Sequence, residues 1–134
     1  MTAARQTITA PAAPPAIGPY SHAVLADLRS AGGLLFCSGQ IPLDPSTGEI
    51  VGASYAEQTR RCLENLQAVC EAADASLAQA VRLTIYTTNM GNFAEINEVY
   101  GSFFAGEDPP ARVTVEVSAL PKGALVEIDA IVAI

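Results

Sequence analysis

The amino-acid sequence predicts a single domain of the α+β class, in which two helices pack on one face of a mixed β-sheet. Stretches of alternating apolar and polar residues, typical of strands buried on one side, recur along the chain. Two stretches with apolar residues at helical spacing interrupt them. A chain of 134 residues is long enough for one hydrophobic core. We therefore expect one domain over residues 1–134, with the order β-β-β-α-β-α-β-β.

Three strands are predicted in the first third of the chain. Residues 5–10 fit a short strand at the edge of the sheet. Residues 11–20 contain four prolines, which exclude a helix and favour an extended backbone. Residues 21–28 and 33–38 predict a pair of strands joined by a short connection. The Pro, Asp, Ser and Gly residues of 39–50 predict a loop.

A first helix is predicted over residues 54–73. Ser54 and Glu57 form a capping box, in which each side chain satisfies a backbone N–H group at the start of the helix. One stripe of this helix is apolar or small: Tyr55, Thr59, Cys62, Leu63, Leu66, Val69, Cys70 and Ala73. Two of the three cysteines lie on the stripe, and Cys37 lies in an apolar strand. We expect all three to be buried, reduced thiols rather than ligands or nucleophiles.

Residues 80–88 predict another strand, and Asn92 with Glu95 repeats the capping pattern at the start of a second helix. The apolar face of that helix carries Phe93, Ile96, Tyr100, Phe103 and Phe104. Since each helix has a single apolar stripe, both fit one layer on one face of the sheet. The other face then needs a cover, which subunits packed sheet to sheet would provide.

Residues 109–134 show the clearest alternation. Val113, Val115 and Val117 share one face of a strand, opposite Arg112, Thr114, Glu116 and Ser118. After a Pro-Lys-Gly break, the apolar residues Val126, Ile128, Ala130, Val132 and Ile134 lie opposite Glu127 and Asp129. Charged groups beside an apolar sheet are unfavourable unless they are paired with a partner or take part in binding or catalysis. An ordinary solvated sheet face is the alternative interpretation.

Composition limits the partners of the protein. Hydrophobic residues make up 50% of the chain and charged residues 16%, so surplus apolar surface predicts a homo-oligomer. A net charge of −7, with Lys and Arg scattered singly, argues against a nucleic-acid partner. The apolar runs are too short to span a membrane, and no signal pattern is visible, so we expect a cytoplasmic protein. No cluster of metal ligands is apparent, and we expect neither metal nor cofactor.

The candidate chemical groups are few. Arg112 can bind a small carboxylate through two parallel hydrogen bonds, and Glu127 can hold a water and accept its proton. Tyr20 and Ser38 can orient that water or the leaving group. Such a set suffices for hydrolysis when the substrate is already electrophilic, as an iminium is. We expect the lone His22 to be a partly exposed strand residue, with contact to a ligand as the alternative.

The positions of Arg112 and Glu127 restrict where a shared site can lie. If the last two strands formed a hairpin, Glu127 would lie near Glu116 or Val117. Arg112 would then lie roughly 15 Å away, at ~3.4 Å per residue. One site that uses both side chains therefore requires a different strand order or residues from neighbouring subunits, and this points to an interface.

Five segments resemble the RidA/YjgF family of enamine and imine deaminases, and together they cover nearly the whole chain. They are AIGPYSHAV at 16–24, LLFCSGQIPLDPSTGEIV at 34–51, QTRRCLENLQAVCEAA at 58–73, NFAEINEVYGSFF at 92–104 and PPARVTVEVSALPKGALVEIDAIVA at 109–133. The last is the most specific, with an arginine after Pro-Ala followed by VEV, LPKG and VEIDAI.

The resemblance implies a chorismate-mutase-like fold and a homotrimer with sites in the clefts between subunits. It also implies hydrolysis of 2-iminobutanoate and 2-iminopropanoate to 2-oxo acids and ammonia. By position, Arg112 binds the substrate carboxylate and Glu127 holds the attacking water. The other residues implied at the site are Tyr20 as a further catalytic group, and Ser38, Gly39, Gly91 and Thr114 for substrate binding.

The sequence departs from the family pattern at three positions. Thr114 stands where many members have cysteine, which removes a thiol but keeps the backbone N–H. His22 stands where glutamine is common, and Gly91 where a polar side chain is common. The departure at His22 bears on the preferred substrate size, and the departure at Gly91 bears on one wall of the site.

Three other functions remain open. A non-catalytic, regulatory trimer could use the same arginine to bind stable 2-oxo acids. A deaminase of aminomuconate-like substrates would need a wider pocket. Some family members have been described as ribonucleases or translation inhibitors, but the acidic charge of this chain disfavours that function.

Overall fold

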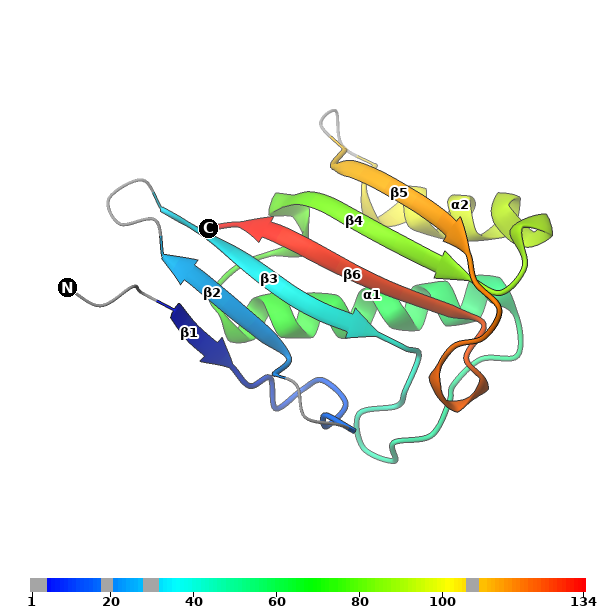
Figure 1. Ribbon diagram of the computed structural model, residues 1–134, viewed down its shortest axis with the longest axis horizontal. Helices are drawn as coiled ribbons and strands as arrows, with labels where there is room; N and C mark the ends of the chain where they lie inside the picture. The colour runs from blue at the N-terminus through cyan, green and yellow to red at the C-terminus, as the bar shows by residue number, and fades with distance from the viewer. Residues whose placement is uncertain (1–4, 18–20, 28–31, 106–108) are drawn as a thin grey trace.

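The computed structural model describes residues 5–17, 21–27, 32–105 and 109–134, and it confirms the predicted α+β class (Figure 1). Six strands form one mixed sheet in the order β1-β2-β3-β6-β4-β5, and two α-helices cover one face of it. The strands are β1 (Arg5–Ile8), β2 (Ala23–Asp27), β3 (Gly33–Gln40), β4 (Ala80–Thr87), β5 (Ala111–Glu116) and β6 (Val126–Ala133). The helices are α1 (Tyr55–Ala72) and α2 (Phe93–Phe103), with short 3₁₀ turns η2 (Leu77–Gln79), η3 (Met90–Asn92) and η4 (Pro121–Gly123). In the described ranges no helix combines the length and apolarity needed to cross a membrane.

Helix α1 begins where the capping signal predicts. The Ser54 hydroxyl oxygen accepts a hydrogen bond from the Glu57 N–H at 3.1 Å. The Glu57 carboxylate accepts one from the Ala53 N–H at 3.4 Å. The predicted stripe packs against the sheet, and Cys62, Leu63, Leu66, Val69 and Cys70 have no exposed surface. All three cysteines are free and buried, as expected.

Helix α2 begins at Phe93 without the predicted cap. Asn92 forms no side-chain bond to a backbone N–H group; instead its amide donates to the Glu95 carboxylate at 2.6 Å. Turn η3 precedes the helix directly, and the Phe93 N–H donates to the Met90 carbonyl within it. The N–H group of the first helical residue is thus bonded within η3. Ile96 and Tyr100 are the buried residues of this helix.

The core lies between the helices and one face of the sheet. Leu35, Leu83, Ile85, Val126, Ile128 and Val132 contribute fully buried side chains from the strands. Each such side chain stabilises the fold by about 1.5–3 kcal/mol relative to an exposed one. The predicted alternation is therefore confirmed over β6, where Val126, Ile128, Ala130 and Val132 face the helices, whereas Ile134 lies beyond the strand and is 41% exposed.

The last two strands do not form a hairpin. Strand β4 lies between them, parallel to β5 and antiparallel to β6. Within the described part of the chain, the other face of the sheet carries no helix (Figure 1). Phe36, Val113 and Val115 are 43%, 39% and 36% exposed there. We refer to this surface as the open face.

Candidate active site

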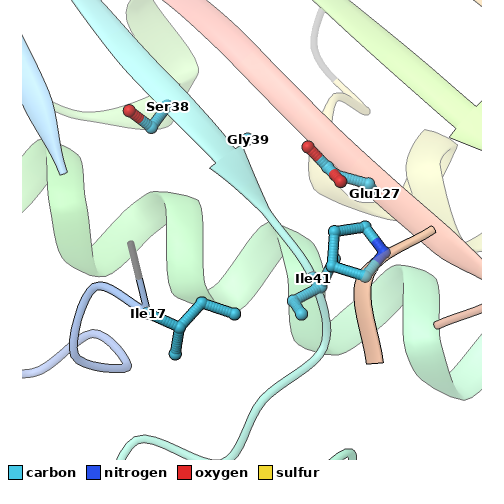
Figure 2. Close-up of a pocket in the computed structure, with 6 residues that line it drawn as sticks. Ile17, Ser38, Gly39, Ile41 and Glu127 are labelled. Atoms are coloured by element: carbon cyan, nitrogen blue, oxygen red, sulfur yellow. The ribbon is translucent and has the colours of Figure 1, made fainter. Parts of the chain in front are cut away.

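Glu127 is placed on the open face by the alternation of β6. Its neighbours Val126 and Ile128 are fully buried beneath the helices, so the intervening side chain points the other way. The carboxylate lines a pocket of about 200 Å³ at the end of the sheet where β3 ends and β6 begins. Figure 2 shows the pocket, whose other lining residues are Ile17, Ser38, Gly39, Ile41 and Pro121.

A β-bulge in β3 forms one wall of this pocket. Cys37 pairs with Ala130 and Gln40 with Ile128, so β3 has one more residue than β6 between the two pairs. Gly39 lies in the bulge, directly against Glu127. A Cβ atom at position 39 would lie only 3.0 Å from the Cδ of Glu127. The absence of a side chain at Gly39 therefore allows the carboxylate to lie against the backbone of β3.

Ser38 contributes to the same wall, but its hydroxyl group has a partner. The hydroxyl donates to the Ser21 carbonyl at 2.6 Å, and the Ser38 N–H donates to the His22 carbonyl at 2.9 Å. In Figure 2 the Ser38 oxygen points away from Glu127. These bonds fix the position of the bulge relative to β2, and the Ser38 oxygen retains only acceptor capacity.

The surroundings of Glu127 favour its neutral form more than water does. Burial, and then the negative charge of Asp129, raise the pKa of Glu127 above its ordinary value. Asp129 accepts a hydrogen bond from the Tyr86 hydroxyl at 3.0 Å on the same face. A carboxylate with a raised pKa accepts a proton more readily at neutral pH, which suits a general base that activates water.

Arg112 lies away from this pocket. Its partner in the register of β4 is Leu83, which is fully buried on the helix side of the sheet. The guanidinium group lies over the rings of Tyr100 and Phe93 of α2, 4.7 and 5.4 Å from their centroids. It donates to the Asn97 side-chain oxygen at 2.7 Å. Within one chain, Arg112 and Glu127 are thus on opposite faces of the sheet, with β4 between their strands.

Thr114 lies beside Arg112 on the helix side of β5, where its register partner is Ile85. Its hydroxyl oxygen is buried and has no hydrogen-bond partner among the residues that the structure describes, and the same holds for the nearby Tyr100 hydroxyl. Arg112, Thr114 and Tyr100 therefore form a second polar group, separate from the Glu127 pocket.

The remaining candidates are distributed as follows. Gly91 lies in η3, where its N–H donates to the Asn89 side chain at 2.8 Å, and it does not line the Glu127 pocket. The Met90 N–H donates to Glu116 at 2.6 Å, which ties this turn to the end of β5. Tyr20 lies outside the described residues. The described part of the chain contains no group of three His, Cys, Asp or Glu side chains that could hold a metal ion.

The prediction for His22 is wrong. The imidazole is only 6% exposed and lies just before β2, bonded to the preceding segment. The Ala10 N–H donates to its Nδ1 at 2.9 Å, and its Nε2 lies 2.7 Å from the Pro14 carbonyl oxygen. This segment is also not fully extended as predicted, because the Ala13 N–H closes a turn onto the Ala10 carbonyl at 3.1 Å.

Comparison with known proteins shows which family the chain belongs to. The model of the family described as "Endoribonuclease L-PSP" matches residues 10–134. The chain is 54% identical to the protein DfrA of Myxococcus xanthus, over 96% of this chain and 95% of the relative. It is 39% identical to the 2-iminobutanoate/2-iminopropanoate deaminase of Rattus norvegicus, over 95% and 88% of the two chains.

A solved structure agrees in fold along almost the whole chain. RidA from an Antarctic Psychrobacter superposes with a TM-score of 0.85 at 40% identity, covering 96% of this chain and 99% of that one. The chain belongs to the RidA/YjgF family. The sequence resemblance to RidA/YjgF proteins and the fold it implies are thereby confirmed, and the family includes relatives named as imine deaminases.

Proposed function

We propose that the protein is a deaminase that hydrolyses small 2-imino acids, such as 2-iminobutanoate and 2-iminopropanoate, to 2-oxo acids and ammonia. The observation that carries the proposal is the Glu127 carboxylate, which has a raised pKa and lies against Gly39 in a small, mostly apolar pocket. The pocket on one chain, about 200 Å³ beside Glu127, has room for an acid of three or four carbons. The rodent relative bears the name of this activity.

The reaction needs one base and one anchor for the substrate carboxylate. Glu127 accepts a proton from a water as the water oxygen bonds to the iminium carbon, and the C=N electrons move to nitrogen. The protonated Glu127 then donates to the amino group of the resulting carbinolamine. Ammonia leaves with the C–N electron pair as the hydroxyl passes its proton to the Glu127 carboxylate and the C=O bond forms, and Glu127 then gives this proton to the departing ammonia. The sum is iminium plus water giving the 2-oxo acid and ammonium.

Arg112 would anchor the substrate carboxylate from a second copy of the chain. The two side chains lie on opposite faces of one sheet, so a site with both requires residues from neighbouring subunits. The exposed apolar residues Phe36, Val113 and Val115 of the open face support packing between subunits. We propose the homotrimer implied by the family as this assembly, with Tyr20 and Thr114 near the anchored carboxylate.

A coupled assay tests the proposal. A threonine dehydratase releases the imine, and formation of 2-oxobutanoate is followed in competition with semicarbazide. The protein is expected to speed keto-acid release, and both Arg112→Ala and Glu127→Gln are expected to abolish the effect while the trimer persists. An intact trimer that binds 2-oxobutanoate without speeding its release would show a binding protein instead.

Mixed assemblies test whether Arg112 and Glu127 of one site come from two different copies of the chain. Arg112→Ala and Glu127→Gln chains are unfolded together, refolded at equal concentrations and assayed. Random trimers would contain native Arg112 and Glu127 together at about a quarter of their interfaces, so about a quarter of the activity should return. No recovery, despite proven mixing, would contradict a site shared between copies.

A further inference from the structure

We propose that His22 is a positioning residue that sets the substrate-size preference of the Glu127 pocket. It holds residues 10–17, here called the N-terminal segment, against β2 and the bulge of β3. This inference rests on the proposed function, because it assigns a specificity role at the same pocket.

The hydrogen bonds of His22 select one tautomer of its ring. Since Nδ1 accepts the Ala10 N–H at 2.9 Å, that nitrogen carries no proton. The proton of the neutral ring is then on Nε2, which donates to the Pro14 carbonyl at 2.7 Å. One buried side chain thus holds two points of the N-terminal segment, on either side of the turn closed by the Ala13 N–H and the Ala10 carbonyl.

The same residue is tied to the pocket through its backbone. The His22 carbonyl accepts the Ser38 N–H at 2.9 Å, and the preceding Ser21 carbonyl accepts the Ser38 hydroxyl at 2.6 Å. Ser38 lies in the bulge that places Gly39 against Glu127. His22 therefore links the N-terminal segment to the wall on which the carboxylate lies.

Ile17 is the part of the N-terminal segment that reaches the pocket (Figure 2). It follows Pro14 by three residues, so at most about 10 Å of chain separates it from the point that His22 holds. Ile17 and Ile41 are apolar lining residues of the Glu127 pocket. An apolar wall discriminates between substrates that differ by one methylene by about 10- to 200-fold. Release of the N-terminal segment removes one such wall and affects the larger imino acid more.

Three substitutions of His22 distinguish the contribution of its bond to Ala10 from that of its bond to Pro14. His22→Leu removes both of them. His22→Asn keeps an acceptor near the position of Nδ1, and His22→Gln keeps a donor near the position of Nε2. Leu77→Ala is the control for lost stability, since Leu77 is 3% exposed and belongs to η2, which follows the end of α1.

Each variant is assayed for kcat and KM with 2-iminobutanoate and 2-iminopropanoate. Affinities for the stable acids 2-oxobutanoate and pyruvate are measured by calorimetry, and exchange of the Ala10 amide is followed by NMR. In His22→Leu we expect the preference for the four-carbon acid to fall about tenfold through KM, with kcat for 2-iminopropanoate within about twofold of wild type. Exchange of the Ala10 amide should accelerate at least about tenfold. His22→Asn or His22→Gln should restore part of the preference.

Two results would overturn the inference. One is an unchanged size preference in His22→Leu, and the other is an equal change in Leu77→Ala at the same loss of melting temperature. Absence of turnover by the wild-type protein would instead refute the proposed deaminase activity. The affinity ratio of 2-oxobutanoate to pyruvate, compared between wild type and His22→Leu, would then still decide the role of His22.

Discussion

Gly39→Ala tests the geometry of the proposed base most directly. The added Cβ would lie 3.0 Å from Cδ and 3.2 Å from Cγ of Glu127, and closer still to Oε2. Ordinary contacts between heavy atoms lie at about 3.5–4.0 Å, so the carboxylate must move on the order of 1 Å. The group that moves is the free end of a side chain, and so the fold can accommodate the change.

A displacement of this size lowers catalysis far more than stability. Misplacing a catalytic group by about 1 Å reduces turnover about 100-fold. We therefore expect kcat for 2-iminobutanoate to fall about 100-fold in the coupled assay, with the free energy of unfolding within about 1 kcal/mol of wild type. The double variant Gly39→Ala/Glu127→Gln should be no slower than Glu127→Gln alone, because both changes act through one carboxylate.

Gly101→Ala is the matched control. A Cβ at position 101 meets nothing within 4 Å, and the residue lies inside α2. This change should leave turnover unaltered and stabilise the protein by about 1 kcal/mol. Full activity of a correctly folded Gly39→Ala protein would refute the reasoning, since the Glu127 carboxylate could not then be acting from the position seen in Figure 2.

Three further changes probe the site and its supports. Glu127→Gln should raise the free energy of unfolding at neutral pH, because burial and Asp129 raise the pKa of the native carboxyl and so disfavour its charged form in the folded state. As pH falls through that raised pKa the native carboxyl is protonated and the difference closes, which urea unfolding from about pH 4 to pH 8 would measure. Asn65→Leu leaves the Ile41 and Leu43 carbonyls without the amide donor that they share at 3.4 and 3.0 Å, and should destabilise by about 1–3 kcal/mol, seen in the melting temperature. Arg112→Ala should lower kcat/KM by about 100-fold or more while removing only about 1 kcal/mol of stability, the value of its contact with the aromatic rings of α2.

Features that depend on neighbours in the sequence were predictable. The start of α1 followed from Ser54 and Glu57, because capping involves groups only three residues apart. The faces of β6 followed from strict alternation, which alone puts Glu127 opposite the core. The start of α2 was also located, although Asn92 bonds to Glu95 rather than capping the backbone.

Features that depend on distant partners were not predictable. Alternation does not say which strands pair, so the position of β4 between β5 and β6 was missing from the sequence-based interpretation. The bulge at Ser38 and Gly39 was missed as well, since one extra residue appears only against a partner strand. Burial of His22 was missed for the same reason, because its partners at Ala10 and Pro14 lie 12 and 8 residues away in the sequence.

The placement of β4 between the strands of Arg112 and Glu127 has a consequence for how activity scales with protein concentration. A site built from residues of two subunits, as proposed, exists only while the subunits are assembled. Turnover per chain should therefore fall on dilution below the dissociation constant of the assembly. If the site is shared as proposed, a cell that makes defective chains alongside intact ones would lose activity out of proportion to their number, because each intact chain would need a competent neighbour on either side.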